Sequence, residues 1–462
     1  MKTGRTSTRL LAALVCGSLF VAACSDDKKD DGATDETTVD STGDSTVTTD
    51  ATETTIGEPE TWAVDTADCI DPAAADELIE GTIKIGAVMP LTGDTSADEA
   101  FSPVVAGWQA YMDYANETGL LGDVTIEHSV EDDQYNKDLT PGAVSSLIDA
   151  GVQVFSGILG SPNNLAVRDT LNEECIPQLG NLTGLPAWGT DVADYPWTTG
   201  QLVPYTVESR VYMQFLKEQF PEGATVALFY VNSDFGQSYA DVIKAEGAEF
   251  GLEIVAEETI EPTDSAPPAG QLTTIAAAKP DAIISIPLGA GCISYLAALA
   301  EKKAQTAGWE PMNIVTNTCA SALILAVAGA NGTGLYTSNN LLDVADPANA
   351  ALPQVKAYLE FMDSKGLSDK VTTATAGWNT AETTVAIIKQ AQESEAGLTR
   401  ASIINAARNF EYTPSMGRPG VVFKMNGEAD AFLAESLQVL QWDAGTSKFT
   451  PQGDLITDFE TA

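Results

Sequence analysis

From Thr82 onward, short apolar segments alternate with stretches of helical periodicity. Residues 282–286 read AIISI, so a strand there is apolar on both of its faces. Such strands suit a parallel sheet that helices cover on each side. Repeated strand–helix units of this kind predict a doubly wound α/β fold. About 380 residues follow Thr82, which is too many for one sheet, so we expect two.

The predicted strands and helices follow from this alternation of short apolar segments and helical periodicity. We predict strands at 83–89, 124–130, 152–158, 225–231, 253–257, 282–286, 313–316, 334–338, 420–423 and 436–442. We predict helices at 103–116, 141–150, 164–174, 205–219, 237–250, 271–278, 292–305, 354–365, 380–393 and 399–409.

The first 23 residues have the composition of an export signal. Lys2, Arg5 and Arg9 make the start basic, and residues 10–23 are almost wholly apolar or small. That stretch is too short to span a bilayer comfortably, so we interpret 1–23 as a signal peptide. It ends in VAAC at 21–24, which resembles a bacterial lipobox. The resemblance implies cleavage before Cys24 and acylation of Cys24; the alternative is an ordinary signal followed by an incidental Cys.

Residues 24–60 are predicted to form an acidic, disordered tether rich in Thr and Asp. Between 25 and 60, twelve Asp and Glu face two Lys, and large apolar residues are almost missing. Such a segment cannot bury enough apolar surface to offset chain entropy. The whole chain carries a net charge of −43. That charge argues against binding to nucleic acid and against adsorption onto anionic lipid.

Cysteine usage agrees with export. Of six Cys, one lies in the predicted signal and Cys24 is the predicted acylation site, which leaves an even number for an oxidising compartment. No CxxC occurs, so a zinc ribbon is not expected.

Two disulfides are predicted. Cys292 begins the helix after the strand at 282–286, and Cys319 follows the next strand. Neighbouring parallel strands would bring those two loops within bridging distance. The second pair, Cys69–Cys175, follows partly by elimination and would attach the segment before Thr82 to the body of the protein.

Common enzyme motifs are missing from the sequence. The turn after the first strand reads PLTGD rather than GxGxxG, and neither GxxxxGK[ST] nor GxSxG occurs. The only histidine, His128, excludes a multi-His metal site within one chain. His128 is in phase with Ile126 on a predicted strand, so we interpret it as structural. We therefore predict no enzymatic activity, no cofactor and no metal.

Four segments together carry a resemblance to a known family. They read IKIGAVMPLTG at 83–93, EDD at 131–133, VFSGILGSPNN at 154–164 and VALFYVNSDFG at 226–236. Their order and spacing resemble the branched-chain amino-acid-type solute-binding proteins of ABC importers, which have the type I periplasmic-binding fold. The likeness covers roughly residues 80–445.

The resemblance implies two α/β lobes, each with a doubly wound parallel sheet, joined by three crossings near 197–200, 336–340 and 431–435. The first lobe would comprise 61–198 plus 338–432, and the second 199–337 plus 433–462. The ligand would bind in the cleft between the lobes, outside the carboxyl ends of the strands. Closure of the lobes would then bury it.

The loop at 160–163 is the strongest binding candidate. It reads GSPN between an apolar strand and a predicted helix, so Ser161 or Asn163 would cap that helix, with Pro162 in its first turn. Free N–H groups at a helix start attract a carboxylate. The resemblance implies that this loop holds the ligand carboxylate. The alternative is that Ser161 only caps the helix.

Further ligand-binding candidates come from loops at the ends of other strands. Thr183 and Gly184 match the next binding loop of the family, although Gly184 also suits a plain turn. Phe235 matches an aromatic that lines the family's pocket, although such an aromatic is often core. The full set of candidates is Thr92, Phe101, Gly160, Ser161, Asn163, Thr183, Gly184, Asp234, Phe235, Gly289, Thr318 and Trp378.

One departure from the family bears on the ligand. Members that bind α-amino acids place an acidic residue after the strand that corresponds to 313–316, whereas this chain reads NTCAS at 317–321. A buried ammonium without a charged partner is costly. Either Asp234 substitutes for that residue, or the ligand is an amide, a urea-like solute or a carboxylic acid.

These observations predict an exported, monomeric lipoprotein on the outer face of the cell membrane. It would deliver a small polar solute to the permease subunits of an ABC importer. A sensor of the same fold, presenting its ligand to a membrane receptor, is an alternative. A surface-anchored hydrolase is less favoured, because no nucleophile motif accompanies His128.

Overall fold

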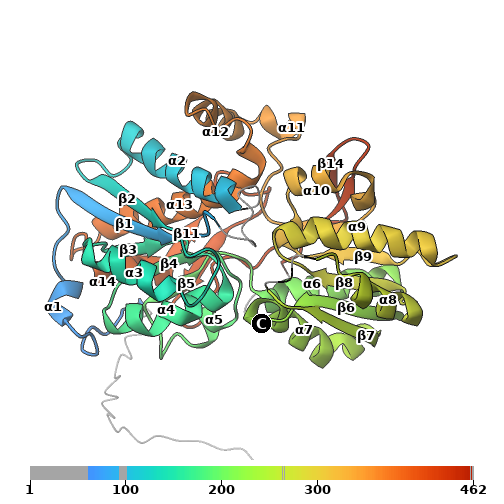
Figure 1. Ribbon diagram of the computed structural model, residues 1–462. Coiled ribbons are helices and arrows are strands. Elements are labelled where there is room, and N and C mark those ends of the chain that lie inside the picture. The colour runs from blue at the N-terminus through green and yellow to red at the C-terminus, as the bar shows by residue number, and fades with distance from the viewer. Residues whose placement is uncertain (1–60, 93–100, 263, 265, 458, 460–462) are drawn as a thin grey trace, which may run out of the picture. The chain divides into compact units, whose positions relative to one another are not determined.

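The computed structural model describes residues 61–92, 101–262, 264, 266–457 and 459. The predicted signal peptide, Cys24 and the acidic tether at 24–60 lie outside these residues. The described residues belong to one compact unit. Within its described part there are two α/β lobes, and each lobe contains its own sheet with helices packed on it (Figure 1). This arrangement confirms the predicted fold class.

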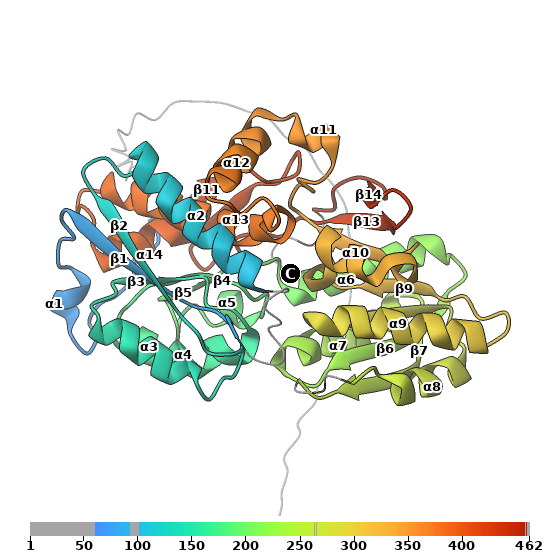
Figure 2. The same ribbon diagram turned by 45° about the horizontal axis from the view of Figure 1, so that its top comes forward.

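The sheet of the first lobe has five strands, all parallel, in the order β2-β1-β3-β4-β5. Helices α2 and α13 cover one face, and α3 and α4 cover the other (Figure 2). The strands are β1 (Thr82–Val88), β2 (Thr125–Glu131), β3 (Val154–Ser156), β4 (Gln178–Asn181) and β5 (Thr198–Gly200). The helices are α2 (Ser102–Thr118), α3 (Thr140–Asp149), α4 (Ser161–Glu173) and α13 (Val371–Gln392).

The sheet of the second lobe has seven strands in the order β14-β13-β10-β9-β8-β6-β7. Five of them are parallel, β13 runs antiparallel to β10, and the edge strand β14 runs antiparallel to β13. The strands are β6 (Ala224–Val231), β7 (Leu252–Ile260), β8 (Ala282–Ile286), β9 (Met312–Val315), β10 (Tyr336–Asn339), β13 (Gln438–Asp443) and β14 (Lys448–Pro451). The helices are α6 (Tyr205–Gln219), α7 (Asp234–Glu246), α8 (Ala269–Ala278), α9 (Ala290–Gln305) and α10 (Ala322–Ala328).

The remaining elements are short or lie outside the two sheets. They are α1 (Pro72–Ala75), α5 (Ala187–Thr190), α11 (Pro347–Ala350), α12 (Pro353–Ser364), α14 (Arg400–Arg408), the hairpin β11 (Asn409–Tyr412) and β12 (Phe423–Asn426), and the 3₁₀ turns η2 (Gly247–Phe250), η3 (Asn317–Cys319) and η4 (Gly329–Gly332). The strand predicted at 420–423 corresponds to β12, which begins three residues later than predicted.

The chain crosses between the sheets three times, after β5, after β10 and between β12 and β13. Strand β5 of the first sheet ends at Gly200, and strand β10 of the second sheet ends at Asn339. Each end lies two residues beyond the predicted lobe limits, which were 198 and 337. The reason is that the strands continue hydrogen bonding up to the crossings.

A close contact of two helices builds the first lobe. A Cβ on Gly107 of α2 would overlap the Ala374 carbonyl, and one on Gly377 of α13 would overlap the Val104 carbonyl. Only glycine permits this approach of two backbones. The contact also explains why α13 begins at Val371, nine residues before the predicted start. Its first turns are rich in threonine, a modest helix former that packing against α2 overrides.

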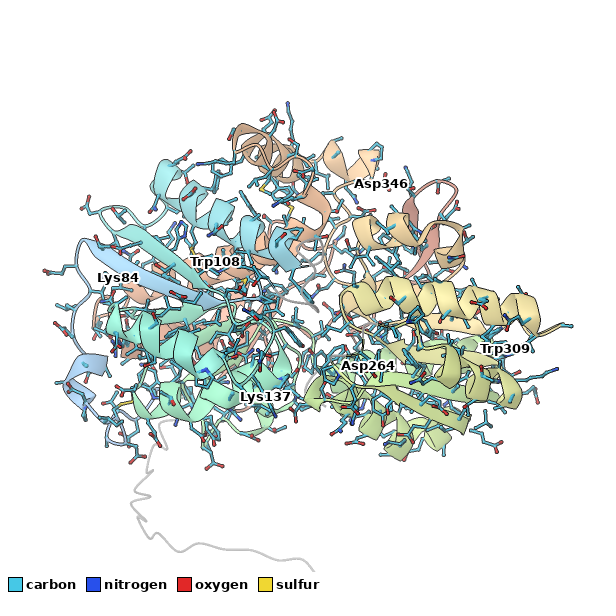
Figure 3. The ribbon with its side chains drawn as sticks, viewed as in Figure 1. Lys84, Trp108, Lys137, Asp264, Trp309 and Asp346 are labelled. Atoms are coloured by element: carbon cyan, nitrogen blue, oxygen red, sulfur yellow. A yellow bond between two sulfur atoms is a disulfide. The ribbon has the colours of Figure 1, made fainter. Side chains whose placement is uncertain are left out.

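Each lobe contains a buried tryptophan whose indole N–H is hydrogen-bonded, Trp108 in the first and Trp309 in the second (Figure 3). Trp108 of α2 donates its indole N–H to Ser156 Oγ at 3.1 Å, at the carboxyl end of β3. Trp309 donates to the Pro280 carbonyl at 3.1 Å, just before β8. Both indoles are almost fully buried, and each N–H is satisfied as burial requires.

The structure contains both predicted disulfides. Cys292 and Cys319 have Cα atoms 5.9 Å apart and join the start of α9 to the end of η3. Cys69 and Cys175 have Cα atoms 5.5 Å apart. The second bridge ties the segment before β1 to the first lobe, as predicted. In the described part of the chain, no helix is long and apolar enough to cross a bilayer, and no three His, Cys, Asp or Glu side chains gather as a metal site.

Candidate functional site

A cavity of about 180 Å³ lies at the carboxyl ends of strands from both sheets. Residues that follow β3, β4 and β5 line it from the first lobe, and residues that follow β6, β8 and β9 line it from the second. The loop after β2, the first turns of α2 and α13 and the crossing after β10 complete the wall. Open α/β sheets bind their ligands at this position.

One part of the cavity wall is apolar and aromatic. The rings of Phe101 and Tyr135 are stacked with centroids 6.0 Å apart. Phe235 and Tyr205 meet edge to face at 5.3 Å. The apolar and aromatic lining side chains are Phe101, Val104, Tyr135, Leu159, Leu182, Leu202, Tyr205, Phe235, Leu288, Ala320, Ile324, Leu341 and Ala376.

The rest of the wall carries hydroxyl and amide groups. These come from the loop that contains η3, from the crossing after β10 and from the first turns of α13. They are Asn317, Thr318, Ser321, Asn339, Asn340, Thr372, Thr373 and Thr375. Ser321 Oγ and Thr373 Oγ1 lie 2.8 Å apart, which joins the second-lobe loop to α13. Among the described residues, no charged side chain lines this cavity.

Five of the candidates from the sequence line the cavity: Phe101, Gly160, Phe235, Gly289 and Thr318. They reach it from loops or helix starts of both lobes. These five candidates therefore lie at one cavity at the carboxyl ends of both sheets, and whether they bind a ligand stays a prediction.

The loop at 160–163 differs from the expectation in one respect. Gly160, not Ser161 or Asn163, is the N-cap of α4, and no side chain makes a capping hydrogen bond there. The predicted cap is wrong because Gly160 adopts a φ of 102°, which glycine tolerates, so the helix begins directly after it. Asn163 instead donates to Asp133 Oδ2 at 2.8 Å.

Ser161 and Thr183 lie beneath the cavity wall. Their hydroxyl oxygens are 2.7 Å apart, and both side chains are buried. Thr183 Oγ1 also accepts the Leu185 N–H at 3.3 Å and the Tyr205 hydroxyl at 3.4 Å. Neither residue is among the side chains that line the cavity.

The other candidates have different surroundings. A Cβ on Gly184 would overlap the Val203 carbonyl and the Tyr205 ring, so Gly184 permits a close packing of the chain. Thr92 Oγ1 donates to Asp132 Oδ2 at 2.5 Å. Neither Gly184 nor Thr92 lines the cavity.

Asp234 and Trp378 also lie away from the cavity. Asp234 is exposed at the start of α7, where it borders a separate hollow of about 500 Å³ together with Lys137, which Figure 3 labels. Trp378 was expected at the start of its helix, next to the predicted helix at 380–393, but it lies two turns inside α13. Its ring packs in an aromatic cluster with Tyr111, Tyr114, Tyr358 and Phe361.

Sequence reasoning missed several lining residues. Tyr135 follows the EDD segment with a positive φ of 55°, which no sequence pattern indicates for tyrosine. Its ring lies so close to Gly160 that a Cβ there would meet it at 2.7 Å. Thr372 and Thr373 were missed because the helix was expected to start later. Asn339 and Asn340 fell within the predicted second crossing, which was a usable signal.

A buried carboxyl group supports the second-lobe wall. Glu208 of α6 accepts the backbone N–H of Asn317 at 2.8 Å and the hydroxyls of Tyr212 at 2.5 Å, Tyr239 at 2.7 Å and Ser338 at 3.3 Å. Burial raises the pKa of Glu208, and these hydrogen bonds act in the opposite direction. The group therefore holds the loop at 317–321 in place.

The comparisons with known proteins agree with this geometry. The family model for periplasmic binding proteins matches residues 82–447. Comparison with curated protein sequences gave no match.

Solved structures share the fold at low sequence identity. A branched-chain amino acid ABC transporter protein from Thermus thermophilus with bound valine has a TM-score of 0.70 at 19% identity, covering 82% of this chain and 97% of that one. A fatty acid ABC transporter substrate-binding protein from Thermomonospora curvata has 0.68 at 21%, covering 83% and 96%. A solute-binding protein from R. palustris in complex with 4-hydroxybenzoate has 0.67 at 18%, covering 82% and 97%.

Proposed function

The chain belongs to the periplasmic binding protein family, and from this membership we propose that it is an exported solute-binding protein of an ABC importer. It would capture a small molecule between its two lobes and deliver it to membrane permease subunits. The three solved structures named above are described as ABC transporter proteins, which supports the proposal.

The observation that carries the proposal is the cavity at the carboxyl ends of both sheets. Each lobe contributes part of its wall, so a bound molecule contacts both lobes at once. A ligand that touches both lobes stabilises the arrangement in which they lie close together. We propose Phe101, Gly160, Phe235, Gly289 and Thr318 as contacts, and the binding roles of Ser161, Asn163, Thr183, Gly184, Thr92, Asp234 and Trp378 stay predictions from the sequence.

A binding role also suits the position of the only histidine. His128 of β2 lies edge to face with Trp108, and its Nε2 is 3.1 Å from Asp113 Oδ1. It does not line the cavity. This arrangement supports a structural role and gives no support to the alternative of a surface-anchored hydrolase.

We further propose that the protein is a monomeric lipoprotein, attached to the outer face of the cell membrane through Cys24. The lipobox-like VAAC at 21–24 and the acidic segment behind it support this proposal. The Cys24→Ser variant should appear in the medium or stay unprocessed, while the native protein fractionates with membranes. A mature N-terminus at another residue would contradict the proposed anchor.

A ligand screen and an uptake assay test the transport role together. Thermal unfolding should be screened against amino acids, amides, urea and short organic acids, as well as uncharged ring compounds. A ligand at 100 times its Kd adds about 2.7 kcal/mol to the free energy of unfolding. Deleting the gene should abolish uptake of the best ligand. Binding without any loss of uptake would favour the alternative role as a sensor for a membrane receptor.

A further inference from the structure

We propose that the ligand is an uncharged, ring-sized molecule with a large apolar surface and one or two hydroxyl, carbonyl or amide groups. This inference rests on the proposed function, because it takes the cavity of about 180 Å³ as the ligand site. It goes beyond the proposed function by excluding zwitterions, carboxylates and amines. The following contacts carry it.

The expected anion site is not open to the cavity. The Ser161 and Thr183 hydroxyls share one hydrogen bond at 2.7 Å and are buried, with 1% and 0% of the residue surface exposed. Tyr135 covers the start of α4, since its ring lies within 2.7 Å of a Cβ placed on Gly160. A ligand in the cavity therefore meets the Tyr135 ring rather than the free N–H groups of α4.

The described wall also lacks a partner for a cation. The second-lobe loop carries Asn317 and Thr318 where an acidic residue would be needed, and the Thr318 hydroxyl already lies 2.9 Å from Thr316 Oγ1 and 3.3 Å from the Pro287 carbonyl. Asp234, the substitute considered from the sequence, is exposed and borders a different hollow.

Glu208 does not serve as that partner either. It is the buried acid behind the loop, and both of its carboxylate oxygens accept hydrogen bonds from the protein. Its position under Asn317 supports the wall without exposing a charge to the cavity. An ammonium in this cavity would therefore be desolvated without an ion pair, which strongly disfavours its binding.

The size and the uneven polarity of the wall define the ligand further. An apolar protein cavity of roughly 150 Å³ holds one benzene molecule, so about 180 Å³ accommodates a substituted ring. The apolar side would pack against Leu159, Leu182 and Phe235. The Thr318 hydroxyl oxygen would accept a hydrogen bond from a polar substituent, and the groups of Ser321 and Asn340 would accept or donate one.

A matched set of probes tests the ligand class by calorimetric titration of the full chain. Benzyl alcohol, benzoate and benzylamine share one ring and differ in charge, and valine represents zwitterions. We expect benzyl alcohol to bind at least tenfold more tightly than each of the other three. Equal or tighter binding of benzoate, benzylamine or valine would overturn the proposal, and so would the failure of all four to bind.

A designed charge tests the position of the ligand. Thr318→Asp should shift the ratio of benzylamine to benzyl alcohol affinity at least tenfold toward the amine, because it adds the missing carboxylate to the wall. Thr274→Asp, on the exposed surface of α8, is the matched control and should leave the ratio unchanged. Ser321→Asp repeats the test on the same loop if Thr318→Asp lowers the Tm more than the control. An unchanged ratio in the folded variant would reject this cavity as the ligand site.

The outcomes also separate this proposal from the proposed function. Tight binding of a charged solute, together with loss of its uptake on gene deletion, would reject only the uncharged ligand class. The absence of any stabilising compound in the broad screen, with unchanged uptake, would reject the proposed function itself.

Discussion

The Glu208 carboxylate accepts the backbone N–H of Asn317 at 2.8 Å, so a buried acid on α6 fixes the loop that forms one wall of the cavity. The same carboxylate accepts hydroxyls from α6, α7 and β10. Four elements of the second lobe therefore meet at one titratable group. This arrangement makes the stability of the wall depend on pH.

The first prediction concerns that pH dependence. Burial raises the pKa of Glu208 above its ordinary value of 4.5, so its favourable contribution to folding is full below pH 4.5 and is lost as the pH rises through the raised pKa. The free energy of unfolding of the wild type, relative to that of Glu208→Gln, should fall across this window by about 1.4 kcal/mol for each unit of the shift. Denaturant unfolding between pH 4 and pH 8 measures it.

Glu218→Gln provides the control on the same helix. Glu218 is exposed near the end of α6, so this variant should follow the wild type at every pH. A constant difference between the wild type and Glu208→Gln from pH 4 to pH 8 would contradict the assigned direction of the shift.

The second prediction concerns the contact of α2 with α13. Gly377→Ala places a methyl group against the Val104 carbonyl, which forces the two helices apart. It should cost about 1–3 kcal/mol of stability, as overpacking usually does. It should also weaken ligand binding, because Thr372 and Thr373 in the first turn of α13 line the cavity.

Gly142→Ala serves as the matched glycine substitution, since nothing lies within 4 Å of a Cβ at this position in α3. It should raise stability by up to about 1 kcal/mol, because alanine is the better helix former. Equal effects of Gly377→Ala and Gly142→Ala in denaturant unfolding would refute the close-contact argument.

The third prediction separates the two disulfides by their effect on ligand binding. On the chain-entropy model, removing Cys292–Cys319 should cost about 3.6 kcal/mol and removing Cys69–Cys175 about 4.8 kcal/mol. Only the first bridge joins loops that line the cavity, near Gly289 and Thr318. The double Ser variant of that bridge should therefore lose affinity as well as stability.

Removing the Cys69–Cys175 bridge should leave affinity unchanged at a temperature where the variant stays folded. The segment that it attaches is also held by hydrogen bonds from the Trp62 and Val64 N–H groups to Asn409 and Asn405. Calorimetric titration of both double variants measures the difference, and a loss of affinity in both would show that the bridges act only through global stability.

The sequence predicted those elements whose residues carry a clear apolar pattern. The strand β8 and the helix α6 have the bounds expected from apolar residues and their periodicity. By contrast, β4 and β5 were not predicted, because Gln178, Asn181 and Thr198 are buried polar residues. Gln178 pairs with Asn164 at 2.8 Å and with Thr198 at 3.2 Å, and such long-range hydrogen bonds leave no local pattern.

The site was predictable only at the strand ends that the family motifs mark. Phe101, Gly160 and Phe235 line the cavity, and they could be predicted because each lies next to a strand or helix that the sequence pattern indicates. Asn340 and Thr373 reach it through a crossing and through the packing of α13 on α2. The predicted second crossing at 336–340 contained Asn340 and was a usable signal for it, whereas Thr373 depends on tertiary packing and no local sequence pattern assigns it to the wall.

The last prediction decides the role of Ser161. Its hydroxyl pairs with Thr183 at 2.7 Å beneath the wall, so Ser161→Ala should lower stability by about 1 kcal/mol and leave the affinity for the best ligand within about threefold. Thr318→Val removes a hydroxyl from the wall itself and should weaken binding of a hydroxyl-bearing ligand about tenfold. Calorimetric titration and denaturant unfolding of both variants measure the two effects. If Ser161→Ala instead weakens binding ten- to a hundredfold without loss of stability, Ser161 contacts the ligand, as the family resemblance implies, and the anion site at the start of α4 is open when the ligand binds.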